Sequence, residues 1–201
     1  MPHSLIKCVT MVELSVISGI QAKGEENLNN KIWTSIFGMV AIEQIIKIII
    51  YNNFFERRFP ILSPILYFEP VFNKHYSWFN SMFQLGVSKW IHIAFVSIMV
   101  ALIYSFYRYL NDRVGTNKLI NVMFAFLFSG ATCSLIGKIF WDGSLDYILV
   151  KGFFTFDLKD VYLNIFNGLL ILSLVLHNKS LNQLDDKKIL KGFVRYILGK
   201  A

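Results

Sequence analysis

The chain has 201 residues, of which 55% are hydrophobic and only 16% are charged, and its formal net charge is +7. A soluble domain usually carries about 25% charged residues. This composition therefore argues against an ordinary water-soluble domain, and 19 Phe exclude a disordered chain. Two Cys are too few for a disulfide framework or a Cys-rich zinc site. We expect an integral membrane protein.

We do not expect a signal peptide in the first 31 residues. Residues 9–20 are weakly apolar, but Glu13 interrupts them and no small-residue cleavage site follows. We interpret residues 1–31 as a cytoplasmic N-terminal extension.

Four apolar segments follow, at residues 32–51, 90–110, 119–141 and 161–177. A helix needs about 20 mostly apolar residues to cross a bilayer, and only internal hydrogen bonds satisfy its backbone there. Buried helices of a soluble bundle would instead show a polar stripe, whereas residues 91–102 contain only His92 and Ser97 as polar side chains. The sequence predicts a mainly α membrane domain of four transmembrane helices over residues 32–177.

Two loops join these segments on one side of the membrane. The first, residues 52–89, is long and aromatic, and Pro60, Pro64 and Pro70 interrupt any helix in it. Because aromatic residues favour strands and sit well at the membrane interface, we expect a small β-rich extracytoplasmic platform there. The second loop, residues 142–160, is rich in Asp.

The basic residues predict the orientation. Twelve Lys and Arg fall on the side of both termini and six on the other side, which predicts that both termini lie in the cytoplasm. They are scattered along the chain, so we expect membrane lipids and no nucleic acid as partners. In the tail, residues 178–201, Ile189, Phe193 and Ile197 share one helical face. This pattern suits an amphipathic helix on the anionic inner leaflet, and ordinary helix packing is the alternative.

Polar side chains in membrane spans usually face the bundle interior, and here they include Glu43, Gln44, Lys47 and Lys138. Glu43 and Lys47 are spaced for an ion pair within one helix. Asp146 follows the outer end of the third span and Asp160 immediately precedes the fourth, so both should lie at one membrane face. Two close carboxylates share a proton, as in aspartic proteolysis. Alternatively, Asp146 is a helix-end residue and Asp160 is an N-cap. The scattered His residues show no metal-ligand spacing, so we expect no metal and no organic cofactor.

Several motifs together resemble lipoprotein signal peptidase (signal peptidase II), a family of four-span bacterial aspartic endopeptidases. Residues 43–47 read E-Q-I-I-K where the family has D-Q-x-x-K, and residues 73–78 read N-K-H-Y-S-W for N-x-G-x-x-F. Residues 129–138 read S-G-A-T-C-S-L-I-G-K for G-G-A-x-G-N-L-I-D-R, and residues 145–148 read L-D-Y-I for V-D-F-I. Residues 156–163 read F-D-L-K-D-V-Y-L for F-N-x-A-D-x-x-I.

The resemblance implies that Asp146 and Asp160 are the catalytic aspartates. The implied supporting or substrate-binding residues are Asn73, Lys138, Asp157, Ser134, Glu43, Gln44 and Lys47. Several of these depart from the family pattern: Ser134 replaces Asn, Lys138 replaces Arg, Asp157 replaces Asn, and Gly137 stands in place of an Asp. A third carboxylate at Asp157 is expected to raise the pKa values of the aspartate pair further.

By this resemblance, the expected function is cleavage of signal peptides from diacylglyceryl-modified prolipoproteins at the outer face of the bacterial cytoplasmic membrane. The expected partners are the lipid-modified prolipoprotein and membrane lipids, and we expect a monomer. The altered residues around the aspartates leave a second hypothesis, a non-catalytic lipoprotein- or lipid-binding protein derived from the family. A third hypothesis is a small transporter subunit that uses Glu43, Lys47 and Lys138 as an ion path.

Overall fold

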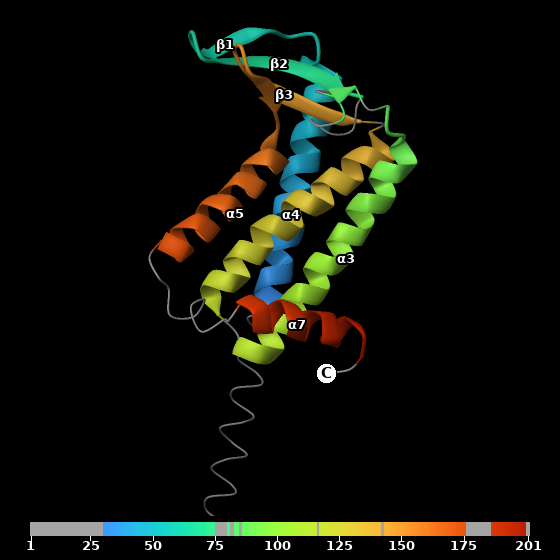
Figure 1. Cartoon of the computed structure of the whole chain (residues 1–201). Helices are drawn as coiled ribbons and strands as arrows, with labels where there is room; N and C mark the ends of the chain where they lie inside the picture. Colours follow the sequence, from blue (N-terminus) through green and yellow to red (C-terminus); the bar gives the residue numbers. More distant parts are fainter. Residues whose placement is uncertain are drawn as a thin grey trace, which may run out of the picture.

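The computed structural model describes residues 30–74, 80, 83–84, 86–115, 117–141, 143–175 and 186–199. The predicted N-terminal extension therefore lies outside the described residues, apart from residues 30 and 31 at the start of the first helix. Four helices are long and apolar enough to cross a membrane: the first helix (Asn30–Phe54), α3 (Lys89–Val114), α4 (Lys118–Phe140) and α5 (Leu158–Val175). They lie side by side below a small sheet (Figure 1). The prediction of four spans is confirmed, and the fourth begins at Leu158 rather than at residue 161.

The helices begin and end at residues that suit these positions. In α4, the Asn117 side chain caps the start by accepting hydrogen bonds from the backbone N–H groups of Leu119 and Ile120. The first helix ends in a short π-helical segment, η1 (Ile50–Phe54). The turn from α3 into α4 passes Gly115 at φ +75°, a conformation that glycine adopts without strain.

The sheet covers one end of the helices. Its four antiparallel strands lie in the order β1 (Phe59–Leu62), β2 (Leu66–Asn73), β3 (Ser144–Val150) and β4 (Phe154–Phe156). The predicted β-rich platform is confirmed, but half of its strands come from the second outer loop, where no strand was predicted. Pairing of β2 with β3 joins the two loops, and it sets Asp146 opposite Val71.

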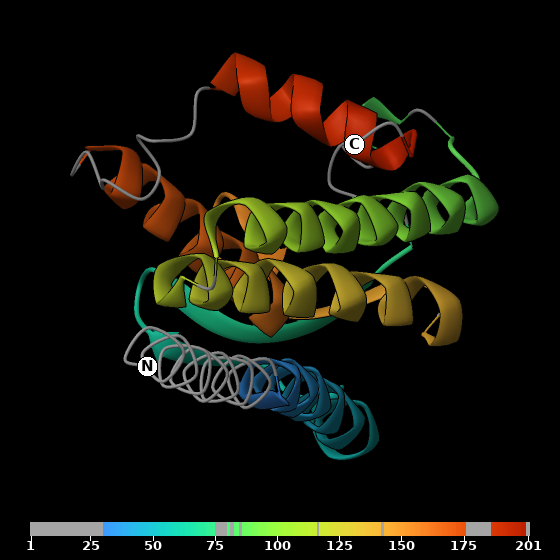
Figure 2. The same cartoon turned by 90° about the horizontal axis from the view of Figure 1, so that it is seen from below.

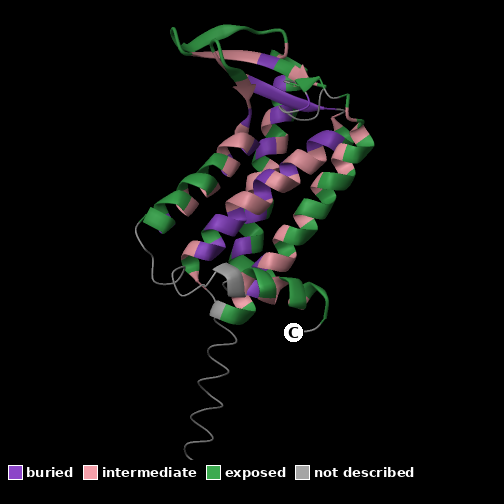
Figure 3. Cartoon of the chain, in the orientation of Figure 1, coloured by how far each residue is buried: buried purple, intermediate pink, exposed green. Residues whose placement is uncertain are grey.

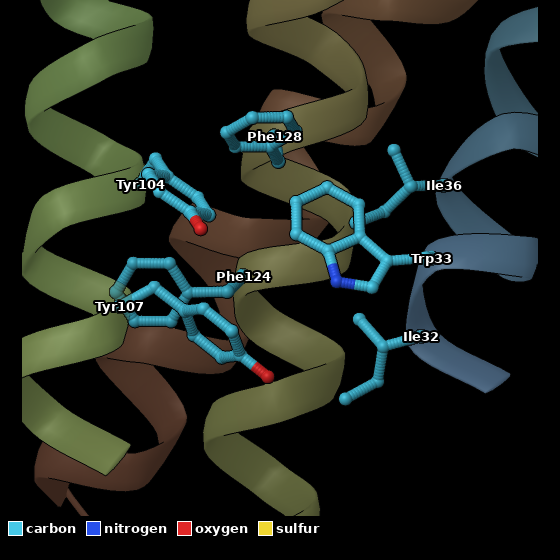
Figure 4. A pocket seen from close by; sticks show the side chains of 7 residues that line it. All are labelled: Ile32, Trp33, Ile36, Tyr104, Tyr107, Phe124 and Phe128. Carbon is cyan, nitrogen blue, oxygen red and sulfur yellow. The ribbon is translucent and has the colours of Figure 1, made fainter. Parts of the chain in front are cut away.

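Two hydrophobic clusters hold the helices together. One lies under the sheet around Ile50, Leu145 and Tyr147. The other lies toward the opposite end, where the first helix, α3 and α4 meet, and Figure 4 shows part of it. There the ring of Trp33 meets Phe128 edge-on at 5.5 Å between centroids. A void of about 10 Å³ lies among these side chains, so the rings around Trp33 are closely packed.

The outer faces of the helices are apolar and exposed. Figure 3 shows that much of α3 and α5 is exposed, and these faces carry large hydrophobic side chains such as Phe95, Ile98 and Ile171. A soluble protein would not expose so continuous an apolar surface. These faces suit contact with lipid, and the four apolar helices make the chain a multi-pass membrane protein.

The amphipathic helix predicted in the tail is present as α7 (Asp186–Ile197). It lies across the end of the bundle away from the sheet and beside α3 (Figures 1 and 2). Ile189 and Phe193 pack against the hydrophobic cluster there, whereas Ile197 is exposed. The three residues lie four apart in one helix, as predicted, and the contact with the cluster ends before Ile197. The ring of Phe193 contacts that of Phe106 at 5.0 Å, so α7 is attached by ordinary helix packing on this side.

Candidate active site

The acidic residues of the second outer loop converge where the sheet meets α5. Asp146 lies on β3, and Asp157 and Asp160 lie at the start of α5. The backbone N–H of Asp160 donates to Asp157 Oδ1 at 3.3 Å, and the backbone N–H of Asp157 donates to Asp160 Oδ2 at 3.2 Å. This reciprocal arrangement is a capping box. The alternative in which Asp160 is the N-cap and Asp146 a helix-end residue is therefore wrong: Asp157 occupies the cap position, and Asp146 lies within a strand.

The three carboxylates are close together. One oxygen from each of Asp146, Asp157 and Asp160 lies within 4.8 Å of the others. Their side chains differ in exposure, at 9%, 0% and 36% respectively. Asp146 and Asp160 are the predicted catalytic pair, and Asp160 is the more exposed of the two. A water molecule or substrate can therefore reach Asp160 more easily.

Lys159 lies in the middle of these carboxylates, and the sequence analysis missed it. Its Nζ lies 2.7 Å from Asp157 Oδ2 and 3.3 Å from both Asp146 Oδ1 and Asp160 Oδ2. It also donates to Ser144 Oγ at 2.8 Å. The sequence analysis counted Lys159 only as a basic loop residue. The signal that could have revealed it is that Lys159 stands where the resembling motif has Ala.

A second lysine approaches from the first helix. Lys47 Nζ lies 2.8 Å from Glu43 Oε1 and 2.7 Å from Asp157 Oδ2, and all three side chains are fully buried. The predicted pair of Glu43 and Lys47 therefore exists, and it belongs to a larger network. Asp157 Oδ2 is shared by Lys47 and Lys159. This carboxylate oxygen links the first helix to α5.

Asp157 and Asp146 lie outside the membrane-spanning helices, and their pKa values are shifted in opposite directions. Burial alone would raise the pKa of Asp157, but the charges and hydrogen bonds of Lys159 and Lys47 bring it below its usual range. Burial raises the pKa of Asp146, and the charge of Asp157 adds to this effect, as predicted from the sequence, while Lys159 and Ser144 oppose it. Asp157 is thus the firmly ionised member of this pair.

Asp146 and Asp160 open into a cavity of about 410 Å³. It is lined by Asn73, Ser134, Lys138, Ser144, Asp146, Phe154, Thr155, Lys159, Asp160 and Asn164. Three of the predicted supporting residues, Asn73, Ser134 and Lys138, are among them. Lys138 Nζ donates to Ser134 Oγ at 2.9 Å, so these two side chains form one polar wall of the cavity.

Not every predicted site residue reaches this cavity. Gln44 Oε1 accepts a hydrogen bond from the indole N–H of Trp141 at 3.0 Å, which ties the first helix to the end of α4. Glu43 and Lys47 act from behind, through Asp157. No motif pointed to Ser144 or Asn164, which the sheet and α5 bring to the cavity. A cation held by the three carboxylates would need the space that the Lys159 ammonium fills.

Comparison with known proteins decides the family. The family model described as signal peptidase (SPase) II matches residues 35–176. The chain belongs to the signal peptidase II family. The matched range includes almost all of the first helix, the other three spans, both outer loops and every residue of the cavity.

The structural comparison shows a related fold. One solved structure of a bacterial membrane enzyme matches with a TM-score of 0.59 and 19% identity, over 73% of this chain and 88% of that chain. A second matches with a TM-score of 0.60 and 18% identity, over 72% of this chain and 92% of that chain. No curated protein matches the chain. The family is one of peptidases that process lipoprotein signal peptides.

Proposed function

We propose that this chain is an aspartic endopeptidase that cleaves signal peptides from diacylglyceryl-modified prolipoproteins at the outer face of the bacterial cytoplasmic membrane. The observation that carries the proposal is the placement of Asp146 and Asp160. They come from a strand and a helix on opposite sides of a hairpin, and each places a carboxylate oxygen within 4.8 Å of the other in one shared cavity.

The exposure of the two aspartates suggests their roles. Asp160, the more exposed, is the base that accepts a proton from water. Asp146 accepts a hydrogen bond of 2.7 Å from Ser144 Oγ and lies 3.3 Å from Lys159 Nζ. Its role is to position these two groups beside the reacting bond. Lys138 and Asn73 lie on the cavity wall, where they can bind the substrate backbone. The apolar outer faces of the helices suit the signal helix of the substrate.

The test is cleavage of a lipid-modified prolipoprotein in a strain that lacks its own signal peptidase II. Asp160→Asn and Asp146→Asn should each lower cleavage by about 10³-fold or more. The first removes the base that accepts a proton from water, and the second removes the carboxylate that positions Ser144 and Lys159. The matched control is Asp112→Asn, at the exposed end of α3, which should cleave like the wild type. Membrane insertion of each variant is checked by fractionation. Retained processing by either catalytic-site variant would refute the proposal.

One observation favours a second candidate function. The Lys159 ammonium contacts both Asp146 and Asp160, and such a contact suits a protein that binds lipid-modified prolipoproteins without cleaving them. In that case the wild type would capture the lipidated precursor but fail to rescue the deficient strain. The transporter hypothesis loses its basis, because Glu43 and Lys47 are fully buried in ion pairs.

A further inference from the structure

Lys159 has more acceptors around it than protons to donate. Its Nζ lies within 3.3 Å of four oxygens, from Ser144, Asp146, Asp157 and Asp160. An ammonium carries three protons and accepts no hydrogen bond. One of its N–H groups can therefore turn from a carboxylate to another oxygen without leaving the ammonium unbonded.

Lys159 comes with its own counter-charge. Asp157 contacts it at 2.7 Å and is fully buried. Positions 157 and 159 are both uncharged in the motif that the chain resembles, where they carry Asn and Ala. The two substitutions together add one negative and one positive charge that touch each other, so they leave the net charge of the site unchanged.

We propose that the Lys159 ammonium takes the place of the proton that two catalytic aspartates would otherwise share, so that Asp146 and Asp160 are both ionised at neutral pH. The ammonium lies at hydrogen-bond distance from one oxygen of each aspartate. A positive charge this close favours the ionised form of both. An aspartate pair without such a charge can relieve its repulsion only by holding a proton.

The surrounding charges are consistent with this state. Lys138 on α4 and Asp157 and Lys159 at the start of α5 face the pair. Glu43 and Lys47 on the first helix lie behind them, where Lys47 contacts both Glu43 and Asp157. With Asp146 and Asp160 ionised, the site holds four acids and three bases. Its net charge is then −1, which is small for a buried network.

The reaction that follows from this state rests on the proposed function. In this state, Asp160 is the one carboxylate that carries a proton during cleavage. Asp160 takes one proton from water, and the hydroxide oxygen bonds to the scissile carbonyl carbon as the carbonyl π bond breaks. The resulting oxyanion accepts a hydrogen bond from Lys159, which keeps its proton. Asp160 then gives its proton to the amide nitrogen as the C–N bond breaks. The new carboxylic acid loses its proton to solvent, and Lys159 and Asp146 are unchanged.

The direct test measures the protonation of the pair and does not depend on activity. The full chain in detergent micelles is examined by infrared spectroscopy at neutral pH for the carbonyl stretch of a protonated carboxylic acid. In the wild type we expect Asp146 to contribute no band of this kind, so Asp146→Asn should leave this region of the spectrum unchanged. The double variant Asp157→Asn, Lys159→Ala should gain a band, and adding Asp146→Asn should remove it again. The double variant exchanges the charged pair for the neutral residues of the motif.

A wild-type band that Asp146→Asn abolishes would overturn the proposal, and so would a folded double variant without the new band. Thermal unfolding establishes that the double variant is folded. If it is not, Lys159→Met alone is measured in the same way.

The second readout is the pH profile of prolipoprotein cleavage. Losing the ammonium should move the alkaline limit of activity down by about one pH unit or more, because the pair must then hold a proton. A merely structural role for Lys159 would lower the rate without moving this limit and would overturn the proposal. If the infrared result is as expected but the wild type does not cleave, the proposed function fails while the ionised pair stands. A double variant that cleaves where the wild type does not would overturn the role of Lys159 in the reaction.

Discussion

Lys47 is fully buried, and a buried charge is stable only when groups of opposite charge contact it. Replacing it with Met would leave Glu43 and Asp157 buried beside each other with one cation fewer. Breaking a buried ion pair in this way usually costs about 3–5 kcal/mol. We therefore expect Lys47→Met to lower the free energy of unfolding by about that amount, measured by denaturant titration in detergent micelles.

The matched control for this prediction is Glu43→Gln. It removes the other end of the same ion pair, but Lys47 keeps its contact of 2.7 Å with Asp157. Its loss of stability should therefore be clearly smaller. Equal losses for the two variants would show that Lys47 is not held mainly by Asp157.

At the scale of single residues, the sequence predicted the aspartates but not their environment. Asp146 and Asp160 were identified by the resemblance, and so were Lys138 and Ser134, which lie on the cavity wall. Lys159 was missed because its neighbours come from β3 and α5 together. A basic residue beside an Asp in sequence says nothing about which carboxylates the folded chain brings around it.

At the scale of elements, α4 and α5 approach closely at Gly130. A Cβ atom at this position would lie 2.8 Å from the Leu163 side chain and 3.2 Å from the backbone carbonyl of Lys159. Gly130→Ala should therefore push α5 outward and lower the free energy of unfolding by about 1–3 kcal/mol. It should also slow the proposed cleavage, because the backbone that carries Lys159 must move. Both are measured on the same purified sample.

Gly168→Ala is the matched control for this prediction. It lies in the same pair of helices, on α5, and a Cβ there meets nothing within 4 Å. Alanine is favoured over glycine inside a helix by up to about 1 kcal/mol, so this variant should be as stable as the wild type or more so. If Gly130→Ala behaves like Gly168→Ala, close packing at Gly130 does not position α5.

The strands of the second outer loop, β3 and β4, were not predicted from the sequence. Aromatic residues and prolines indicated a β-rich first outer loop, and β1 and β2 lie there. The second loop was singled out only for its acids, although residues 144–147 alternate between polar and apolar side chains and residues 144–150 form β3. Its pairing with β2 joins residues more than 70 positions apart. Such pairing depends on the arrangement of the helices below, which no local pattern reveals.

At the scale of the whole molecule, the two ends of the helix bundle differ. The cavity opens beside the sheet at one end of the bundle, and α7 packs at the other. Under the proposed function, the site must face outward to meet exported precursors, and we therefore expect the sheet end to lie outside the cytoplasm. The distribution of Lys and Arg predicts the same orientation independently of the site.

Cysteine labelling in intact cells tests this orientation. In a chain with Cys8→Ser and Cys133→Ala, a single cysteine is introduced by Lys151→Cys or by Asp112→Cys. Lys151 is exposed in the turn between β3 and β4, and Asp112 is exposed near the end of α3 opposite the sheet. A maleimide that cannot cross membranes should label the first variant in intact cells and the second only after permeabilisation. The reversed pattern would place the cavity in the cytoplasm, where it could not meet a precursor at the outer face, and would refute the proposed function together with the predicted orientation.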